Sequence, residues 1–213
     1  MSNTISITLG GTLIAFAMFS SPAAASPAAS VTPVDFTNAA FAPTSGPTSI
    51  PIGAADFCKA HRDDCRPTAQ VVDAERLSQA SWQQLIAIND NVNATVVPET
   101  DEDNYHVAEY WTYPANGRGD CEDIALEKRR ELVAAGWDPS TLLMTVVREK
   151  SGEGHALLMV RTDRGDMMLD NQDPRILLWS DTAYEFVKRQ SQADAGKWVA
   201  LNDDRPMVIA ASN

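Results

Sequence analysis

The chain has 213 residues, which suggests one domain or two small ones, and 44% of them are hydrophobic, which is enough for a globular core. Its formal net charge of −12 argues against proteins that bind nucleic acid or anionic membranes through a basic surface. The acidic balance identifies no partner, because many soluble proteins share it.

Residues 1–25 have the character of a removable export signal. The apolar run ISITLGGTLIAFAMF is shorter than the roughly 20 residues of a membrane span. Ala23 and Ala25 fit the small-x-small cleavage pattern before Ser26, although no Lys or Arg precedes the run. We therefore expect a periplasmic or secreted protein, and an uncleaved anchor is the alternative.

Residues 26–55 are rich in Ala, Pro, Ser and Thr and carry almost no charge. This composition predicts an extended leader in front of a single domain over residues 56–213. Phe36, Phe41 and Ile52 are the apolar side chains of the leader that could dock on that domain.

The three cysteines divide into a close pair and a single residue. Cys58 and Cys65 lie together in FCKAHRDDC, and in an oxidising compartment such a pair predicts a disulfide. A metal site formed by Cys58, His61 and Cys65 is the alternative. Cys121 is then an odd thiol in an exported chain, which calls for an explanation.

Two segments in the first two thirds of the chain have helical periodicity. Residues 73–92 present a broad apolar face, and Asp73 is the expected N-cap. Residues 120–136 form the second predicted helix, with Asp120 as N-cap and Asp123 in a variant of the capping box. In this register Cys121 occupies the first helical turn.

The periodicity then changes to short apolar runs, which predict strands over residues 141–149, 155–162 and 166–172. The turn sequence TDRGD joins the last two in a hairpin. A helix over residues 180–190, capped by Ser180, and a strand within KWVAL complete the prediction. Helices followed by sequential strands indicate an α+β fold with a mostly antiparallel sheet.

Cys121, His155 and an acid at the end of the following strand suggest a thiol nucleophile, its base and an orienting group. A helix start favours a thiolate, and His155 begins a strand after a flexible GEG sequence. The acid is Asp170 or Asp173, both in LDNQD. Each residue alone is more often structural, whereas their ordered combination favours catalysis.

The blocks RGDCEDIALEKRRELVAAG and GEGHALLMVRTDRGDMMLDN resemble the bacterial transglutaminase-like cysteine peptidases, from about residue 57 to residue 198. The resemblance implies a papain-like or transglutaminase-like core, with the nucleophile at a helix N-terminus packed on an antiparallel sheet. It implies Cys121 as nucleophile, His155 as general base and Asp170 as orienting acid. Trp111 matches a recurrent tryptophan of the family, and core packing explains it equally well.

The hairpin geometry does not by itself select the acid. Symmetry about the turn sets His155 nearer to Asp173 than to Asp170, and a bulge at Gly165 would correct this. We follow the resemblance and assign Asp170.

The LapG-type members of the family are periplasmic proteases that bind calcium beside the nucleophile. The resemblance therefore implies a calcium site at Asp120, Glu122 and Asp123, whose negative charge otherwise opposes a thiolate. Further oxygens would come from backbone carbonyls or from the acids of ETDED, residues 99–103. Helix capping by Asp120 and Asp123 is the simpler interpretation, and the two can coexist.

LapG-type proteases release large surface adhesins, so the resemblance also implies a protein substrate of that kind and an inner-membrane receptor as regulator. Two other functions stay open. The same three residues could serve a transglutaminase or an amidase, since the sequence does not distinguish water from an amine as acceptor. A calcium-responsive binding protein without activity is the alternative from another functional class.

Overall fold

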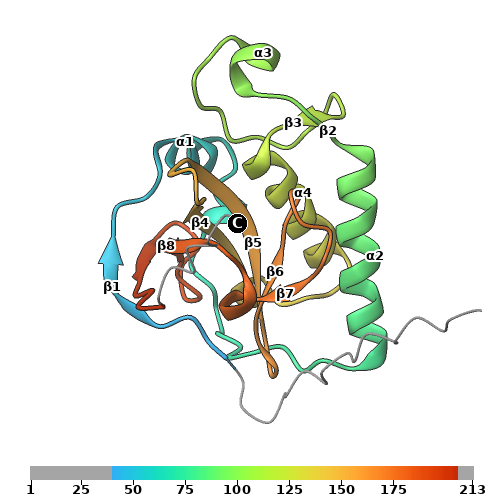
Figure 1. The fold of residues 1–213 in the computed structure, drawn as a ribbon, viewed down its shortest axis with the longest axis vertical. Helices are drawn as coiled ribbons and strands as arrows, with labels where there is room; N and C mark the ends of the chain where they lie inside the picture. Colours follow the sequence, from blue (N-terminus) through green and yellow to red (C-terminus); the bar gives the residue numbers. More distant parts are fainter. Residues whose placement is uncertain (1–39, 206–213) are drawn as a thin grey trace, which may run out of the picture. The chain divides into compact units, whose positions relative to one another are not determined.

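Residues 40–205 are described by a computed structural model, in which a sheet is flanked by helices (Figure 1). The predicted export signal over residues 1–25 and Phe36 lie outside this described part. Within residues 40–205, no helix is both long and apolar enough to cross a membrane.

The helices, including three short 3₁₀ turns (η), are α1 (Ile52–Ala60), η1 (Arg62–Cys65), α2 (Gln79–Thr95), α3 (Asp101–Tyr105), α4 (Cys121–Ala134), η2 (Pro139–Thr141) and η3 (Trp179–Asp181). The strands are β1 (Thr44–Thr48), β2 (Val97–Pro98), β3 (Arg118–Gly119), β4 (Leu142–Arg148), β5 (Gly154–Thr162), β6 (Gly165–Leu169), β7 (Leu177–Leu178), β8 (Glu185–Gln190) and β9 (Trp198–Leu201).

Seven strands form one sheet in the order β1-β9-β8-β4-β5-β6-β7, and all neighbours in it are antiparallel. β2 and β3 pair separately, in parallel, just before α4. Helix α4 contacts both β5 and α2, so it lies between the sheet and α2 (Figure 1). The predicted α+β class with a mostly antiparallel sheet is confirmed.

The central strands are buried on both faces, which explains their continuous apolar runs. Successive side chains of a strand point to opposite faces, so neighbouring residues join different cores. Leu142 of β4 packs with Leu132 of α4 in one core, whereas Leu143 packs with Phe186 in the other. The first of these cores fixes α4 on the sheet and therefore fixes where the helix begins.

Strands β5 and β6 form the predicted hairpin, in continuous register from Leu158–Leu169 to Thr162–Gly165. Gly165 has a φ of 116°, a conformation that L-residues rarely adopt. A Cβ atom there would lie 2.5 Å from the carbonyl oxygen of Ala40, so only glycine fits this turn.

Helix α2 begins after Ser78, so the predicted start at Asp73 is wrong. The Ser78 hydroxyl accepts a hydrogen bond from the Ser81 N–H, and the Ser81 hydroxyl accepts one from the Ser78 N–H. The preceding residues are held by the β5–β6 turn instead, where the Leu77 N–H donates to Asp163 Oδ1 at 3.1 Å. Tertiary contacts therefore delay the start of the helix.

Residues 180–190 contain the end of η3 and strand β8, so the predicted helix from Ser180 is wrong. β8 lies between β4 and β9 and pairs with both. Its Phe186 side chain is buried in the second core. Pairing with β4 and β9 and burial of Phe186 therefore outweigh the helical propensity of this segment.

The last part of the predicted leader, residues 40–55, takes part in the fold. β1 pairs with β9, and the Arg161 guanidinium lies 4.4 Å from the centre of the Phe41 ring. Ile52 starts α1 and is 75% exposed, so it does not dock on the domain.

Cys58 and Cys65 form the predicted disulfide, which links α1 to η1. Both thiols are consumed, so the alternative metal site with His61 is not formed. The His61 ring instead stacks on Phe57, with 4.5 Å between the ring centroids.

Candidate active site

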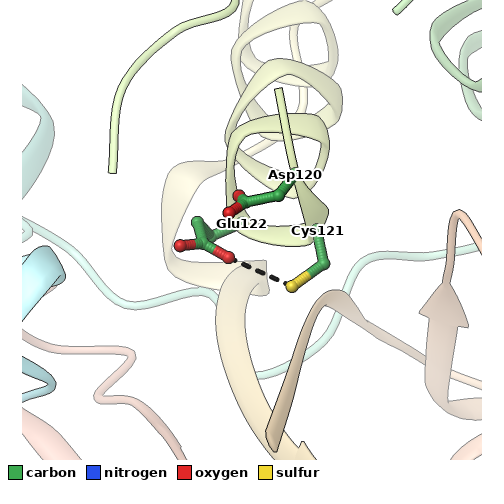
Figure 2. Close-up of side chains that lie close together, drawn as sticks. All are labelled: Asp120, Cys121 and Glu122. Carbon is green, nitrogen blue, oxygen red and sulfur yellow. Dashed lines mark hydrogen bonds between the residues drawn. The ribbon is translucent and has the colours of Figure 1, made fainter. Parts of the chain in front are cut away.

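Cys121 is the first residue of α4, and the packing of this helix on β5 brings its sulfur to the sheet. The Ala156 N–H donates to Cys121 Sγ at 3.4 Å. The thiol itself donates to Glu122 Oε2 at 3.0 Å (Figure 2). Because Cys58 and Cys65 are bonded to each other, Cys121 is the single free thiol of the chain.

Burial, the Glu122 charge and its hydrogen bond raise the pKa of the Cys121 thiol above its ordinary value. The hydrogen bond from Ala156 acts in the opposite direction but is the weaker influence. Burial and the neighbouring carboxyl group thus oppose ionisation of Cys121, whereas its position at the helix start favours a thiolate.

His155, at the start of β5, lies against Asp170, which directly follows β6. His155 Nε2 is 2.8 Å from Asp170 Oδ1, and both residues are 3% exposed. Asp170 Oδ1 also accepts the Gln172 N–H at 3.0 Å, and Oδ2 accepts the Tyr184 hydroxyl at 2.6 Å. Burial opposes ionisation, yet these hydrogen bonds hold the pKa of Asp170 below its ordinary value.

The geometry brings Asp170 to His155, and not Asp173. Extending the β5–β6 register puts Gln172 opposite His155, but β6 ends at Leu169 and the chain leaves the strand there. The hairpin pairing is continuous up to Gly165, so no bulge there is needed to bring Asp170 to His155. The Asp173 carboxylate binds the Arg175 guanidinium at 2.6 and 2.9 Å instead.

The acids beside Cys121 form a buried cluster. The ligand-type oxygens of Asp101, Asp120 and Asp123 lie within 4.8 Å of one another, and the ligand atoms of Asp120, Cys121 and Glu122 form a second such group. Asp101 comes from α3, within the acidic stretch 99–103. The sequence points to that stretch without selecting a residue.

Burial raises the pKa of every carboxyl group in this cluster. The pKa of Glu122 rises to about 9 through burial and then the Asp120 charge. The pKa of Asp123 rises to about 8, mainly through burial. Burial likewise raises the pKa values of Asp101 and Asp120. Burial and mutual repulsion therefore disfavour the charged forms of these acids.

The predicted capping box is wrong. Asp120 occupies the N-cap position of α4, but its carboxylate makes no capping hydrogen bond. Asp123 Oδ1 accepts the Thr112 N–H at 2.8 Å instead. Neither acid makes the expected capping contact, and the ligand-type oxygens of both belong to the cluster.

The residues of this cluster fit a calcium ion. Asp101 Oδ1, Asp120 Oδ1 and Asp123 Oδ2 are buried and accept no hydrogen bond from the described part of the chain. Leaving buried carboxylate oxygens without a partner is unfavourable, and several carboxylate oxygens around one point suit calcium. Gly119 allows this approach, because a Cβ there would lie 2.6 Å from the Asp123 Cβ.

Trp111 belongs to the first core rather than to a polar site. It is 5% exposed, and its ring meets that of Trp198 edge-on with 6.1 Å between centroids. Its indole N–H donates to Glu109 Oε1 at 2.6 Å. The packing interpretation of this tryptophan therefore describes its contacts.

Comparisons with known proteins give structural neighbours and the family of the chain. Two solved structures of Legionella pneumophila LapG, one calcium-bound and one EGTA-treated, are each 25% identical to this chain with a TM-score of 0.49. They cover 59% and 60% of this chain and 71% and 70% of their own. No curated protein matches the chain. The profile of the bacterial transglutaminase-like cysteine proteinases matches residues 44–206, so the chain belongs to this family of cysteine peptidases.

Proposed function

We propose that the chain is an exported, calcium-dependent cysteine peptidase that uses Cys121, His155 and Asp170 to hydrolyse a peptide bond of a protein substrate. One observation supports it most: His155, which is buried against Asp170, is followed on β5 by Ala156, whose N–H donates to the Cys121 sulfur. The packing of α4 on β5 supports the proposal, because it sets Cys121 beside the residue that follows His155.

The orientation of the imidazole defines its role. Nε2 faces the Asp170 carboxylate and donates to it, which leaves Nδ1 as the acceptor for the thiol proton. The side chain of Gln172 lies 3.5 Å from Nδ1, so it must yield when Cys121 approaches. The resulting imidazolium is stabilised by Asp170, as in other nucleophile–base–acid triads.

The reaction is acyl transfer to water. Cys121 Sγ forms a bond to the scissile carbonyl carbon while His155 takes the thiol proton, and the imidazolium then protonates the leaving amine. The Cys121 N–H at the start of α4 is a donor for the developing oxyanion. A water molecule, deprotonated by His155, hydrolyses the acyl-enzyme and restores the thiol.

Asp101, Asp120, Glu122 and Asp123 are the residues that would hold calcium. Calcium supplies positive charge beside the nucleophile, which favours a thiolate. Glu122 would then turn from the sulfur toward the other acids, which removes the hydrogen bond that keeps the thiol protonated. Cys121 would become available to His155.

The substrate and location follow from the family resemblance and the predicted export signal. We expect action in the periplasm on a large surface adhesin, with an inner-membrane receptor as regulator. The acidic charge of the chain is compatible with partners that approach through basic surfaces.

The test uses residues 26–213 with calcium and a surface-protein extract of the source cells. New amino termini, identified by mass spectrometry, should form with the wild type and fall by about 100-fold or more in Cys121→Ala, His155→Ala and Asp170→Ala. Asp173→Ala is the matched control and should retain activity.

Loss of activity in Asp173→Ala but not in Asp170→Ala would refute the assignment of the acid. A fluorescent primary amine added to the same reaction tests the acceptor. Incorporation of that amine without new amino termini would identify a transglutaminase instead of a peptidase.

A further inference from the structure

We propose that Tyr184 is a positioning residue for this reaction: its hydroxyl fixes the Asp170 carboxylate and, through it, the His155 imidazole. The inference rests on the proposed function, because it assigns Tyr184 a part in the same site. Nothing in the sequence pattern marks Tyr184, which lies in the segment predicted as helix.

The two oxygens of Asp170 have different partners. Oδ1 accepts from His155 Nε2 at 2.8 Å and from the Gln172 N–H at 3.0 Å. Oδ2 accepts from the Tyr184 hydroxyl at 2.6 Å. Rotation of the carboxylate about its Cβ–Cγ bond would break these contacts together. At 3% exposure the carboxylate has little access to water as a substitute partner.

Tyr184 also limits the movement of the imidazole directly. The rings of His155 and Tyr184 lie 5.5 Å apart with 43° between their planes. His155 is thus held at Nε2 by the acid and covered on one side by the ring of the residue that holds the acid.

The backbone around Tyr184 is itself fixed by Arg205. The Arg205 guanidinium donates to the carbonyl oxygens of Tyr184 at 2.6 Å and of Trp179 at 2.8 Å. Asp203 binds the same guanidinium at 2.6 and 2.7 Å, and the Trp179 ring lies under it. A chain of contacts therefore runs from Arg205 through Tyr184 and Asp170 to His155.

Tyr184→Phe tests the hydroxyl alone, since the variant keeps the ring. The ring lines a cavity of about 210 Å³ together with Asp170, so the smaller side chain causes no clash there. Tyr113→Phe is the matched control. Its ring packs edge-on against Phe57 in the first core, and its hydroxyl lies near Asp64. The control removes a phenol hydroxyl at a place that has no contact with Asp170.

The readout is the rate at which iodoacetamide alkylates Cys121, measured with calcium from about pH 5 to about pH 9. Tyr184→Phe should slow the reaction roughly tenfold or more near neutral pH, whereas Tyr113→Phe should match the wild type. Losing a donor to its charged form raises the pKa of Asp170, so the variant should lose most of its rate relative to the wild type at the low-pH end of the profile.

The charged groups near the Asp170–Tyr184 pair are His155, Lys128 of α4, and Glu149 and Asp173 beside the Tyr184 hydroxyl. None of them is altered in Tyr184→Phe, so a displaced profile reports the lost hydrogen bond. A purely structural role would lower the melting temperature of the variant and leave the pH profile in place.

His155→Ala separates the two levels of the proposal. If His155→Ala alkylates as fast as the wild type, the proposed function fails and this inference fails with it. If His155→Ala is slow but Tyr184→Phe keeps the wild-type rate and profile, only the role of Tyr184 is overturned. Tyr184→Phe should also add nothing to Asp170→Asn, since both act through one contact, and an additive loss would refute the coupling.

If Tyr184→Phe does not fold, the hydrogen bond between Tyr184 and Asp170 can still be tested in the wild-type protein. The Tyr184 hydroxyl proton should exchange slowly in the proton NMR spectrum of the wild type and rapidly in Asp170→Asn. Rapid exchange in the wild type would overturn the inference.

Discussion

At the scale of single residues, several buried ionisable side chains in and around the site have polar atoms without a hydrogen-bond partner in the described part of the chain. Lys128 of α4 is an example: it is fully buried, and its Nζ has no hydrogen-bond partner among residues 40–205. Burial lowers the pKa of Lys128 to about 7, against the opposing influence of the Asp170 and Asp90 charges. Such a group destabilises the fold whenever it carries its proton.

Lys128→Met should therefore stabilise the protein on the order of a few kcal/mol at pH 7. Between about pH 7 and about pH 10.4 the unfolded chain binds a proton that folded Lys128 does not, so wild-type stability gains with rising pH from this group. The advantage of the variant should accordingly shrink toward about pH 10. Urea unfolding of both proteins at several pH values measures this.

Lys59→Met is the control, because Lys59 is exposed and pairs only with Asp56 at the surface. It should change stability little at any of these pH values. Destabilisation by Lys128→Met at pH 7 would contradict the prediction and would mean that the buried amine has a partner in solution.

At the scale of elements, the acid cluster brings together side chains of α3 and of the start of α4. Asp101 lies in α3, and Asp120 and Asp123 lie at the start of α4. The Asp101 carboxylate also accepts the Tyr110 N–H, which ties the connecting loop to the cluster. A cation at this point would act as a cross-link between α3, the loop and α4.

Removing calcium with EGTA should lower the melting temperature and slow the alkylation of Cys121. Binding requires ionised carboxylates, and the pKa values of Glu122 and Asp123 near 9 and 8 mean that calcium displaces protons. Without calcium, the folded protein keeps these protons at pH values where the unfolded chain has lost them. The stability of the metal-free protein therefore falls as the pH rises toward 9. The calcium-induced rise in melting temperature should therefore be larger at about pH 9 than at about pH 6.

Glu102→Gln serves as the control for this experiment, since Glu102 is an exposed acid of α3 outside the cluster. It should leave the calcium response unchanged, whereas Asp101→Asn should reduce it. An identical melting temperature with and without calcium, in a demonstrably metal-free sample, would refute the calcium site.

At the scale of the whole molecule, the parts that form the site and the parts that stabilise the domain are largely distinct. The site is built from α4 and the β5–β6 hairpin, whereas the disulfide ties α1 to η1. The chain segment from residue 40 closes the sheet through β1 and β9. Stability and reactivity can therefore be changed separately.

The double variant Cys58→Ser, Cys65→Ser should lose about 2.5 kcal/mol of stability, the value expected from the entropy of closing so short a loop. Its alkylation at Cys121 should keep the wild-type rate at temperatures where it is folded. Denaturant unfolding and iodoacetamide labelling measure the two quantities. A large fall in the labelling rate of the folded variant would show that the disulfide also shapes the site.

The sequence predicts those parts of this molecule that depend on local patterns. The β5–β6 hairpin follows from apolar runs around TDRGD, and α4 follows from its periodicity, so the positions of His155 and Cys121 could be anticipated. The conformation of β8 could not be anticipated, because it depends on pairing with β4 and β9, which lie outside this segment. Tyr184 and Asp101 escape for the same reason: their contacts arise only once β8 and α3 have packed.

The hydrogen bond from Cys121 to Glu122 has a consequence for the durability of the enzyme. Peroxides and disulfides react with a thiolate far faster than with a thiol. Burial and the contact with Glu122 raise the pKa of Cys121, so they should slow oxidation of its sulfur as well. If calcium activates Cys121 as proposed above, the metal-free protein should resist peroxide better than the calcium-loaded protein.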